Sequence, residues 1–300
     1  MTDTRPNRGV LITAWAAVLI IGLFRTVMQE VLHRPVSFEQ QSATAAAVVV
    51  AGFALTFLWP KVRPLRPFFG LFLVLVGAHW LVYNWVDELP FYRSWLRNPS
   101  FNVYMLAEQS LNLMVTLIII GFLYLLKRRR ERFFLARGDT AAMVEPTPWL
   151  KVGPGLRWSA FGRILAILIS LGTLAFLIIA GRPPLDIVVR ALPFLPAVLL
   201  AAALNAFNEE VTYKASFLSV LEEPVGKRQS LLLMAAYFGL LHYYGVPYGV
   251  VGVLMAGLLG WLLGKSMLET RGLFWAWFIH LIQDVLIFSF LAIGSITPGG

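Results

Sequence analysis

Apolar runs of about 20 residues, separated by short polar segments, follow one another along most of the chain. A bilayer core requires about 20 apolar residues per helix. Nine runs meet that length or approach it: 10–32, 42–59, 68–86, 103–126, 161–180, 187–220, 230–246, 248–264 and 273–293. The sixth carries Pro193 and Pro196, which predict a kink near its start. The pattern therefore predicts an all-α, polytopic transmembrane helical bundle with about nine spans.

Composition supports this prediction. The chain has 300 residues, of which 58% are hydrophobic and 14% charged, whereas soluble domains carry about 25% charged residues. It has no cysteine, which excludes disulfides, thiolate metal sites and cysteine nucleophiles. The first apolar run is long and lacks a clear cleavage site, so we expect it to be a retained anchor and not a signal peptide.

The basic residues predict the orientation, because cytoplasmic segments are enriched in Lys and Arg. If the N-terminus is cytoplasmic, 18 of the 25 Lys and Arg residues lie on the inside, four on the outside and three within spans. The net charge of +9 then reports topology, and we expect no nucleic-acid partner. The sequence predicts an integral, multi-pass protein of the plasma or inner membrane.

One polar segment divides the chain. Residues 1–126 hold four predicted spans, 127–160 form a basic loop predicted to be cytoplasmic, and 161–300 hold five spans. The loop opens with the run from Lys127 to Arg132, of which five of six residues are basic. Such a run attracts anionic lipid head groups, so membrane lipid is a predicted partner.

Ionisable side chains inside apolar spans are costly, and they indicate functional sites. The C-terminal spans contain Glu209 and Glu210 in the sixth, His242 in the seventh, and His280 and Asp284 in the ninth. Counted from the predicted cytoplasmic ends, these residues lie roughly 10–18 Å deep at a rise of about 1.5 Å per residue. We therefore expect one polar site at a shared level, facing the cytoplasm.

Helical spacing separates the roles of these groups. His280 and Asp284 share a face because they are four residues apart, and so do Glu210 and Lys214. Adjacent residues point about 100° apart on a helix, so Glu209 and Glu210 do different jobs. The spacing predicts that Lys214 neutralises Glu210 and leaves Glu209 to face a cavity.

Residue types alone leave three classes open: a structural polar network, a proton- or ion-coupled transporter, and a hydrolase or metal site. A carboxylate with an imidazole can take a proton from water, and a second imidazole can stabilise an oxyanion. Zinc binds the same groups, so Glu209, His242, His280 and Asp284 are candidate ligands. The helical zinc-protease motif His-Glu-x-x-His is absent.

Three short motifs carry a resemblance: Glu209-Glu210-x-x-x-Lys214, Phe238-x-x-x-His242 and His280-x-x-x-Asp284. In this order they resemble the CPBP family of CAAX proteases and bacteriocin-processing enzymes, also called Abi. That family shows Glu-Glu-x-x-x-Arg, Phe-x-x-x-His and His-x-x-x-Asn or Asp. The resemblance covers about residues 190–290. Two departures are Lys214 in place of Arg, which loses a bidentate fork, and the acidic Asp284, which is a poor oxyanion donor when ionised.

The resemblance implies an intramembrane endopeptidase of the glutamate type or a metalloendopeptidase. By analogy, Glu209 and His242 activate water, and His280 with Asp284 stabilises the oxyanion. Glu210 orients the site together with Lys214, and Phe238 supports it. The implied substrate is a membrane-associated peptide or a prenylated protein. A transporter or another non-catalytic membrane protein is the alternative, and a scaffold that binds partners through the 127–160 loop is the third.

Overall fold

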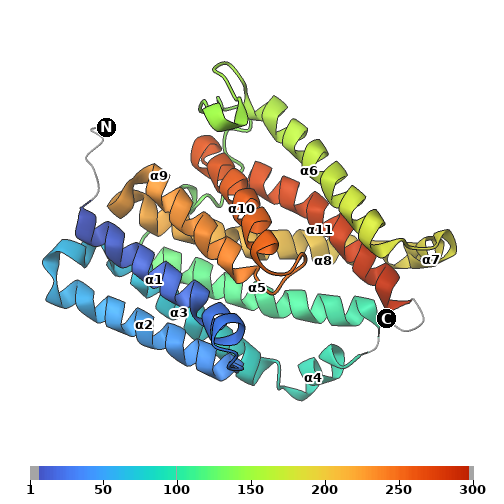
Figure 1. Cartoon of the computed structure of the whole chain (residues 1–300), viewed down its shortest axis with the longest axis horizontal. Helices are drawn as coiled ribbons and strands as arrows, with labels where there is room; N and C mark the ends of the chain where they lie inside the picture. The colour runs from blue at the N-terminus through green and yellow to red at the C-terminus, as the bar shows by residue number, and fades with distance from the viewer. Residues whose placement is uncertain (1–6, 99, 297–300) are drawn as a thin grey trace.

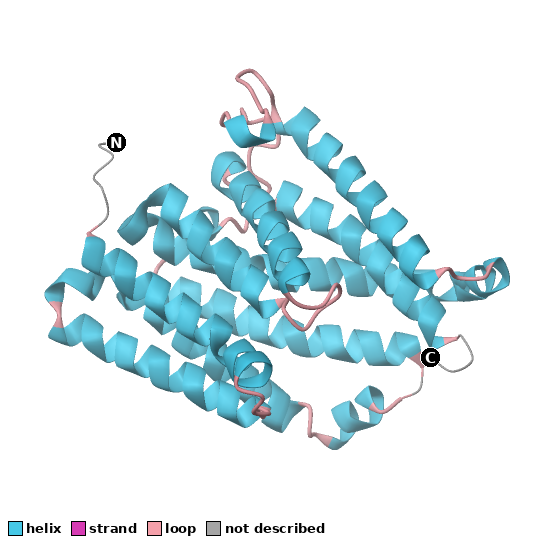
Figure 2. Ribbon diagram, in the orientation of Figure 1, coloured by secondary structure: helices cyan, strands magenta, loops and turns pink. Residues whose placement is uncertain are grey.

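The computed structural model describes residues 7–98 and 100–296. Within these ranges the chain forms helices joined by turns and loops, and no β-strand (Figures 1 and 2). Eight stretches of the described residues are long and apolar enough to cross a membrane. They are Arg8–Val31, Phe38–Leu58, Pro60–Val86, Phe101–Leu125, Trp158–Gly181, Leu185–Leu241, Val250–Thr270 and Phe274–Ser295. The predicted all-α polytopic bundle is confirmed.

The N-terminal half consists of α1 (Arg8–Thr26), α2 (Phe38–Leu58), α3 (Arg66–Leu81), the short α4 (Pro90–Leu96) and α5 (Phe101–Leu125). Wider π-helical turns extend α1 over Val27–Val31 and α3 over Val82–Val86. Both extensions lie at the ends predicted to be non-cytoplasmic. The helix α4 connects the third span to α5 at that same end (Figure 1).

The C-terminal half consists of α6 (Trp158–Gly181), α7 (Leu185–Ala191), α8 (Leu195–Glu209), α9 (Ser216–Leu241), α10 (Val250–Thr270) and α11 (Phe274–Ser295). A tight turn over Leu192–Phe194 separates α7 from α8, so the proline break predicted in the sixth span is confirmed. A π-helical segment, Glu210–Ala215, joins α8 to α9. The helix α8 packs against both α5 and α11, so the N-terminal half provides one wall of the region around Glu209.

The longest candidate span contains two crossings. Leu185–Leu241 has 57 residues, about 85 Å of helix at about 1.5 Å per residue, far more than a bilayer core of about 30 Å. Gly226 breaks the helix with φ 79° and ψ 161°, a conformation that glycine adopts at little cost. The two arms then run antiparallel, since the Phe217 and Tyr237 rings stack 5.0 Å apart. The sixth and seventh predicted spans both lie in this stretch.

Two span boundaries were predicted wrongly. The seventh span was expected to run to residue 246, but α9 ends at Leu241 and His242 lies in the following turn. Tyr243, Tyr244 and Val246 continue the apolar run, so hydropathy predicts a longer helix. Pro247 and the positive φ of Gly249 prevent the helix from continuing. The eighth span is longer than expected and extends to Thr270.

Small residues stand at every fourth position of α10 and allow that helix to approach α9 closely: Gly252, Ala256, Gly260 and Gly264. A Cβ added to Gly260 would lie 2.9 Å from the Phe238 ring, and one added to Gly264 would lie 2.3 Å from Met234. Small residues at every fourth position permit this contact in lipid. This packing fixes the position of the Phe238 ring.

The loop after α5 docks onto the turn between α10 and α11. The backbone N–H of Asp139 donates to the Thr270 carbonyl at 2.8 Å, and the N–H of Leu273 donates to the Ala136 carbonyl at 2.8 Å. The buried Glu269 carboxylate accepts from Trp158 Nε1 at 2.8 Å and pairs with Lys265. The loop therefore holds the start of α11, which carries His280.

We predict that Gly138→Ala loosens this docking. Gly138 has φ +72°, and a Cβ there would lie 2.5 Å from the Thr270 carbonyl oxygen. Gly155→Ala is the matched control, because Gly155 has φ +92° with no atom within 4 Å of the added Cβ. Both changes carry the left-handed penalty of about 1–2 kcal/mol. Limited proteolysis should cut the loop faster in Gly138→Ala than in Gly155→Ala; equal rates would contradict the docking.

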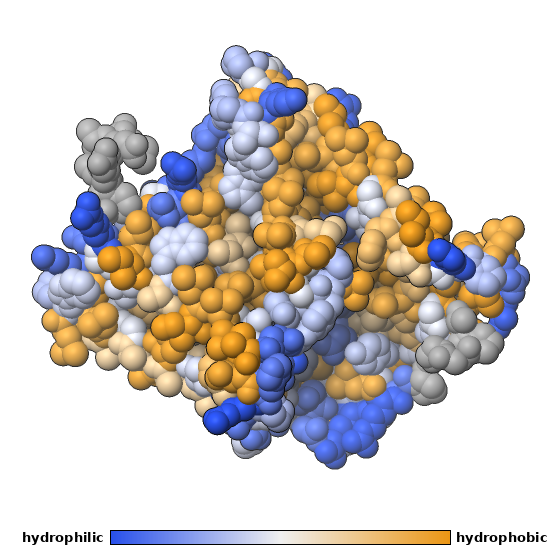
Figure 3. All heavy atoms as spheres, viewed as in Figure 1, coloured by the Kyte–Doolittle hydropathy of each residue, from blue (hydrophilic) through white to orange (hydrophobic). Residues whose placement is uncertain are grey.

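The surface agrees with a lipid environment. Hydrophobic residues cover most of the visible face of the bundle, whereas hydrophilic ones gather at its two ends (Figure 3). Large apolar side chains are exposed along the helices, among them Ile167 at 59% and Leu254 at 66%. Apolar patches of this extent mark a membrane-facing surface.

Candidate active site

Glu210 and Lys214 form a fully buried ion pair. Both side chains have 0% exposure, and Lys214 Nζ donates to Glu210 Oε1 at 2.7 Å. The ammonium group also lies 3.4 Å from the centre of the Phe238 ring, and a ring face attracts a cation. The predicted pairing of these two residues is confirmed, and it joins the first motif to the second across the α9 hairpin.

Glu209 has a different environment. Its side chain is 26% exposed and lines a polar cavity of about 80 Å³. A water molecule takes up about 30 Å³ of liquid, so this cavity has room for more than one. The remaining lining comes from α3, α5, α8 and the π segment: His79, Asn112, Val115, Thr116, Asn205, Asn208, Thr212 and Tyr213. The predicted division between the two glutamates is therefore seen in their surroundings.

His280 lies between carboxylates. Its Nδ1 is 2.6 Å from Glu210 Oε1, so this nitrogen donates to a buried carboxylate. Its Nε2 lies 3.5 Å from Asp284 Oδ1 and 3.8 Å from Glu209 Oε2. Those two distances exceed a good N–H···O bond of about 2.7–3.2 Å. The Nε2 side of the ring therefore faces the carboxylates of Asp284 and Glu209 without a good hydrogen bond to either.

Asp284 acts as an acceptor. Its Oδ2 accepts from Asn205 Nδ2 at 3.0 Å, and the same amide group lies 3.3 Å from Glu209 Oε1. Asn205 thus bridges the two carboxylates. In this arrangement Asp284 is an acceptor for Asn205, and its other oxygen lies near His280 Nε2.

His242 caps the second arm of the hairpin. Its Nδ1 lies 2.7 Å from the Phe238 carbonyl oxygen, and a carbonyl can only accept, so Nδ1 is the donor. In a neutral ring Nε2 then carries the lone pair that can take a proton. The ring lies 4.4 Å from that of Phe238. Glu210 and His242 are each 16 residues from Gly226, which puts them at one level of the antiparallel arms.

The five predicted site residues are joined by contacts of different kinds. The carboxylates of Glu209, Glu210 and Asp284 lie around the imidazole ring of His280. His242 is linked to them through Phe238 and Lys214, and its Nδ1 is held by the backbone. The predicted chemistry requires a water molecule between His242 and Glu209.

Sequence reasoning missed the contribution of Asn205, Tyr213 and His79. The hydroxyl of Tyr213 lies 3.0 Å from His79 Nε2, and His79 Nδ1 lies 2.9 Å from the Leu75 carbonyl oxygen. Nδ1 therefore donates and Nε2 accepts from Tyr213. The available signal was spacing, because Asn205 stands four residues before Glu209, which places the two on one helical face.

The predicted zinc ligands do not form a metal-binding group. Within residues 7–98 and 100–296, no three or more His, Asp or Glu side chains are arranged to hold a metal ion. Zinc bonds to nitrogen and oxygen are about 2.0–2.2 Å long, and three such bonds need ligands that converge on one point. A role for zinc stays a prediction.

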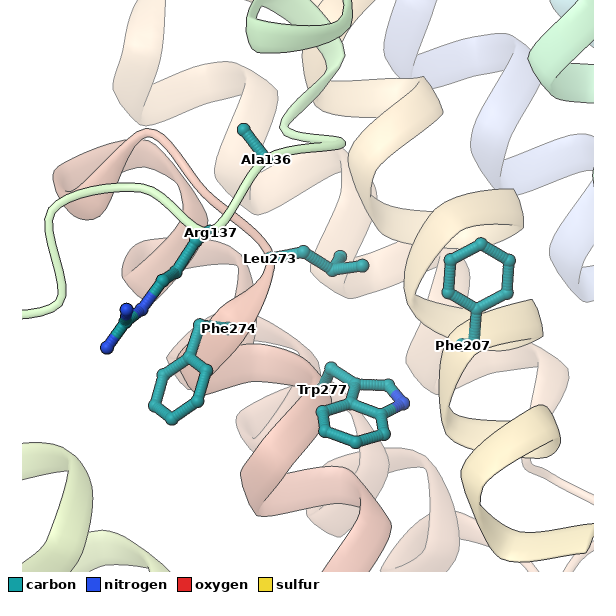
Figure 4. Close-up of a pocket in the computed structure, with 6 residues that line it drawn as sticks. All are labelled: Ala136, Arg137, Phe207, Leu273, Phe274 and Trp277. Carbon is teal, nitrogen blue, oxygen red and sulfur yellow. The ribbon is translucent and has the colours of Figure 1, made fainter. Parts of the chain in front are cut away.

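A second, apolar pocket of about 190 Å³ lies between the docked loop, α8 and α11. Figure 4 shows Phe207 and Trp277 facing each other across this space, whereas the Arg137 side chain points away. Phe207 stands two residues before Glu209, and Trp277 stands three residues before His280. The pocket therefore lies within one helical turn of the polar site on two of its helices.

Comparison with known families agrees with the motifs. Residues 191–286 match the family model described as Rce1-like, type II CAAX prenyl endopeptidase Rce1-like. No curated protein matches the chain, and no solved structure matches it. The matched segment includes all three motifs, the whole of α8, α9 and α10, and the first part of α11. Residues 191–286 are therefore similar to the Rce1-like CAAX prenyl endopeptidase family, in agreement with the CPBP resemblance of the motifs. The apolar helices around them indicate an integral membrane protein that crosses the bilayer several times.

Proposed function

We propose that the protein is an intramembrane endopeptidase that hydrolyses a peptide bond in a membrane-associated or prenylated protein or peptide. The observation that carries the proposal is the contrast between the two adjacent glutamates. Glu210 is buried and bound to Lys214 and His280, whereas Glu209 faces a polar cavity that has room for water. Only the second is available to take up a proton.

In this proposal, Glu209 is the general base. A water held between Glu209 and His242 attacks the carbonyl carbon of the scissile bond, and its proton passes to the Glu209 carboxylate. His242 accepts a hydrogen bond from the same water at Nε2, because its Nδ1 is held by Phe238. The C–N bond then breaks, the proton goes to the leaving amine, and a new carboxylate is released.

His280 supplies the donor for the tetrahedral oxyanion. Its Nδ1 donates to Glu210 Oε1 at 2.6 Å, so a second donor at Nε2 requires the doubly protonated imidazolium form of the ring. The three carboxylates around the ring stabilise its positive charge. Donors that are fixed before the reaction stabilise a developing negative charge at little cost in reorganisation. Asp284 keeps the ring and the Asn205 amide in place. This assignment gives the acidic variant of the motif an orienting role.

The apolar pocket supports a substrate with an apolar or lipid group. Its lining by Phe207, Leu273, Phe274 and Trp277 suits hydrocarbon, and Phe207 and Trp277 stand within one helical turn of Glu209 and His280 along α8 and α11. We keep the expectation that the peptide reaches the site from the cytoplasmic side. The docked loop, with its basic run at the start, lies at that predicted end of the bundle.

The test is cleavage by purified protein in proteoliposomes against a panel of prenylated and unmodified membrane-anchored peptides. The proposal predicts discrete products from at least one of them. A chelator arm with zinc add-back separates a glutamate mechanism from a metal-dependent one. Ion or solute flux without cleavage across the panel would contradict the proposal and support the transporter alternative.

Changes at Asp284 test the orienting role. Asp284→Asn keeps an acceptor oxygen for Asn205, so we expect kcat within about tenfold of wild type, since one hydrogen bond contributes about 0.5–1.5 kcal/mol. Asp284→Leu removes both partners and should lower kcat by about 10²-fold through misplacement of His280. A wild-type rate in Asp284→Leu would show that this carboxylate does not position the site.

A further inference from the structure

A polar stripe on α5 leads away from the catalytic cavity. Tyr104, Glu108, Asn112 and Thr116 follow one another at every fourth position, which places them on one face of the helix. The span Phe101–Leu125 that contains them nevertheless has a mean hydropathy of 1.7 over its membrane-length window. Polar residues inside such a helix are costly, so a continuous row of them needs an explanation other than packing against lipid.

Hydrogen bonds connect one end of the stripe to the residues on either side of Glu209. Thr116 Oγ1 bonds Asn208 Oδ1 at 3.1 Å and Thr212 Oγ1 at 3.0 Å. Thr116 and Asn112 both line the cavity that contains Glu209. The inner end of the stripe is therefore a wall of the proposed catalytic cavity.

The other end of the stripe reaches the part of the bundle that carries α4. Tyr83 OH lies 2.8 Å from Asn112 Oδ1 and 3.0 Å from Glu108 Oε1. Glu108 is half-buried and stands seven residues from the start of α5, about 10 Å along the helix. Asp87, at the end of the third span, has a buried Oδ1 without a hydrogen-bond partner among the described residues.

The outer surface has a polar opening at this place. Figure 3 shows a hydrophilic recess on the visible face, next to the hydrophilic surface over α4 (located in Figure 1). Lipid does not fill a polar recess, since burying unpaired polar groups in hydrocarbon is costly. Water is the occupant that a polar recess of this kind admits.

We propose that this stripe is a water path that supplies the cavity beside Glu209 from the α4 end of the bundle. The α4 end is opposite to the docked loop, because a single span, α5, separates them. Water and substrate would then enter from opposite ends. That this water is the hydrolytic one rests on the proposed function, whereas the path itself does not.

Single-cysteine labelling tests the path, because the natural chain contains no cysteine. Asn112→Cys probes the stripe. Ser94→Cys on α4 and Lys151→Cys in the docked loop, both exposed positions, report the two sides. A membrane-impermeant, charged thiol reagent is added to one side of sealed vesicles, and labelling is read by mass spectrometry.

We expect Asn112→Cys to react from the same side as Ser94→Cys, and Lys151→Cys from the other. Leu117→Cys is the control on the same helix, since Leu117 is 55% exposed towards lipid. It should react at least about tenfold more slowly than Asn112→Cys, because the reactive thiolate does not form in hydrocarbon. Labelling of Asn112→Cys only from the Lys151 side, or no faster than Leu117→Cys, would overturn the path.

The labelling result is independent of peptidase activity, so the two proposals can fail separately. A second measurement links them. Glu108→Leu should lower kcat with KM unchanged, because the water supply and not substrate binding is affected, and Glu108→Gln should restore the rate by keeping polar groups in the stripe. A rise in KM with kcat unchanged in Glu108→Leu would show that the stripe serves substrate binding.

Discussion

Glu209→Gln should abolish peptide cleavage while leaving the protein folded. The amide cannot accept the proton of water, and loss of a general base lowers kcat by about 10²–10⁴-fold. The carboxylate is partly exposed and its contact with His280 Nε2 is long, at 3.8 Å, so its replacement by an isosteric amide leaves the packing intact. The measurement is kcat at equal amounts of folded protein, assessed by thermal unfolding in detergent.

Glu210→Gln is the matched control for this result. It neutralises the adjacent glutamate by the same chemical change, but at a buried position where Lys214 and His280 depend on the charge. We expect lower thermal stability in Glu210→Gln and unchanged stability in Glu209→Gln. Equal stability loss in both variants would contradict the assignment of different roles to the two residues.

We expect Lys214→Met to lower the free energy of unfolding more than any other substitution proposed for this protein. It leaves Glu210 as an uncompensated buried charge, and breaking a buried ion pair from one side costs about 3–5 kcal/mol. The methionine side chain is of similar length and apolar, so lost packing contributes little. The measurement is the free energy of unfolding, by denaturant titration of the protein in micelles.

Lys214→Arg tests the departure from the family motif. Glu210 Oε2 is buried and has no hydrogen-bond partner among the described residues, because the single ammonium group of Lys214 binds Oε1. A guanidinium group donates to both oxygens of a carboxylate. We expect Lys214→Arg to retain the fold and activity. A stability loss as large as that of Lys214→Met would show that the site has no room for the fork.

The bundle was predictable because its signal is long and repeated. Each apolar run is bounded by charges or by prolines, and the break near Pro193 and Pro196 appears as predicted. The end of the seventh span was not predictable from hydropathy. Tyr243, Tyr244 and Val246 continue the apolar run, whereas the backbone has already left the helix at His242.

Part of the site was also readable from spacing. The four-residue interval between Glu210 and Lys214 predicts their ion pair, and the structure contains it. The bridging role of Asn205 was not predictable, since it joins Glu209 on its own helix to Asp284 on α11. Contacts between helices distant in sequence depend on how α8 and α11 pack.

The N-terminal spans contain functional candidates among their polar residues that mean hydropathy does not reveal. The polar stripe of α5 and His79 lie outside the segment that the motifs cover, and both contact it, through Thr116 and through Tyr213. Each polar residue alone is compatible with a span, so the average over the span hides the row. The row of polar residues is recognised only from its four-residue spacing and from the packing of α5 on α8.

Hydrolysis in ¹⁸O-labelled water tests the central claim most directly. Wild-type protein and Glu209→Gln are incubated in parallel with a membrane-anchored peptide, and the products are weighed by mass spectrometry. The account predicts that the wild type forms a new C-terminus that carries one ¹⁸O atom, and that Glu209→Gln forms none. Equal labelled product from the two proteins, or intact peptide with the wild type across the substrate panel, would contradict it.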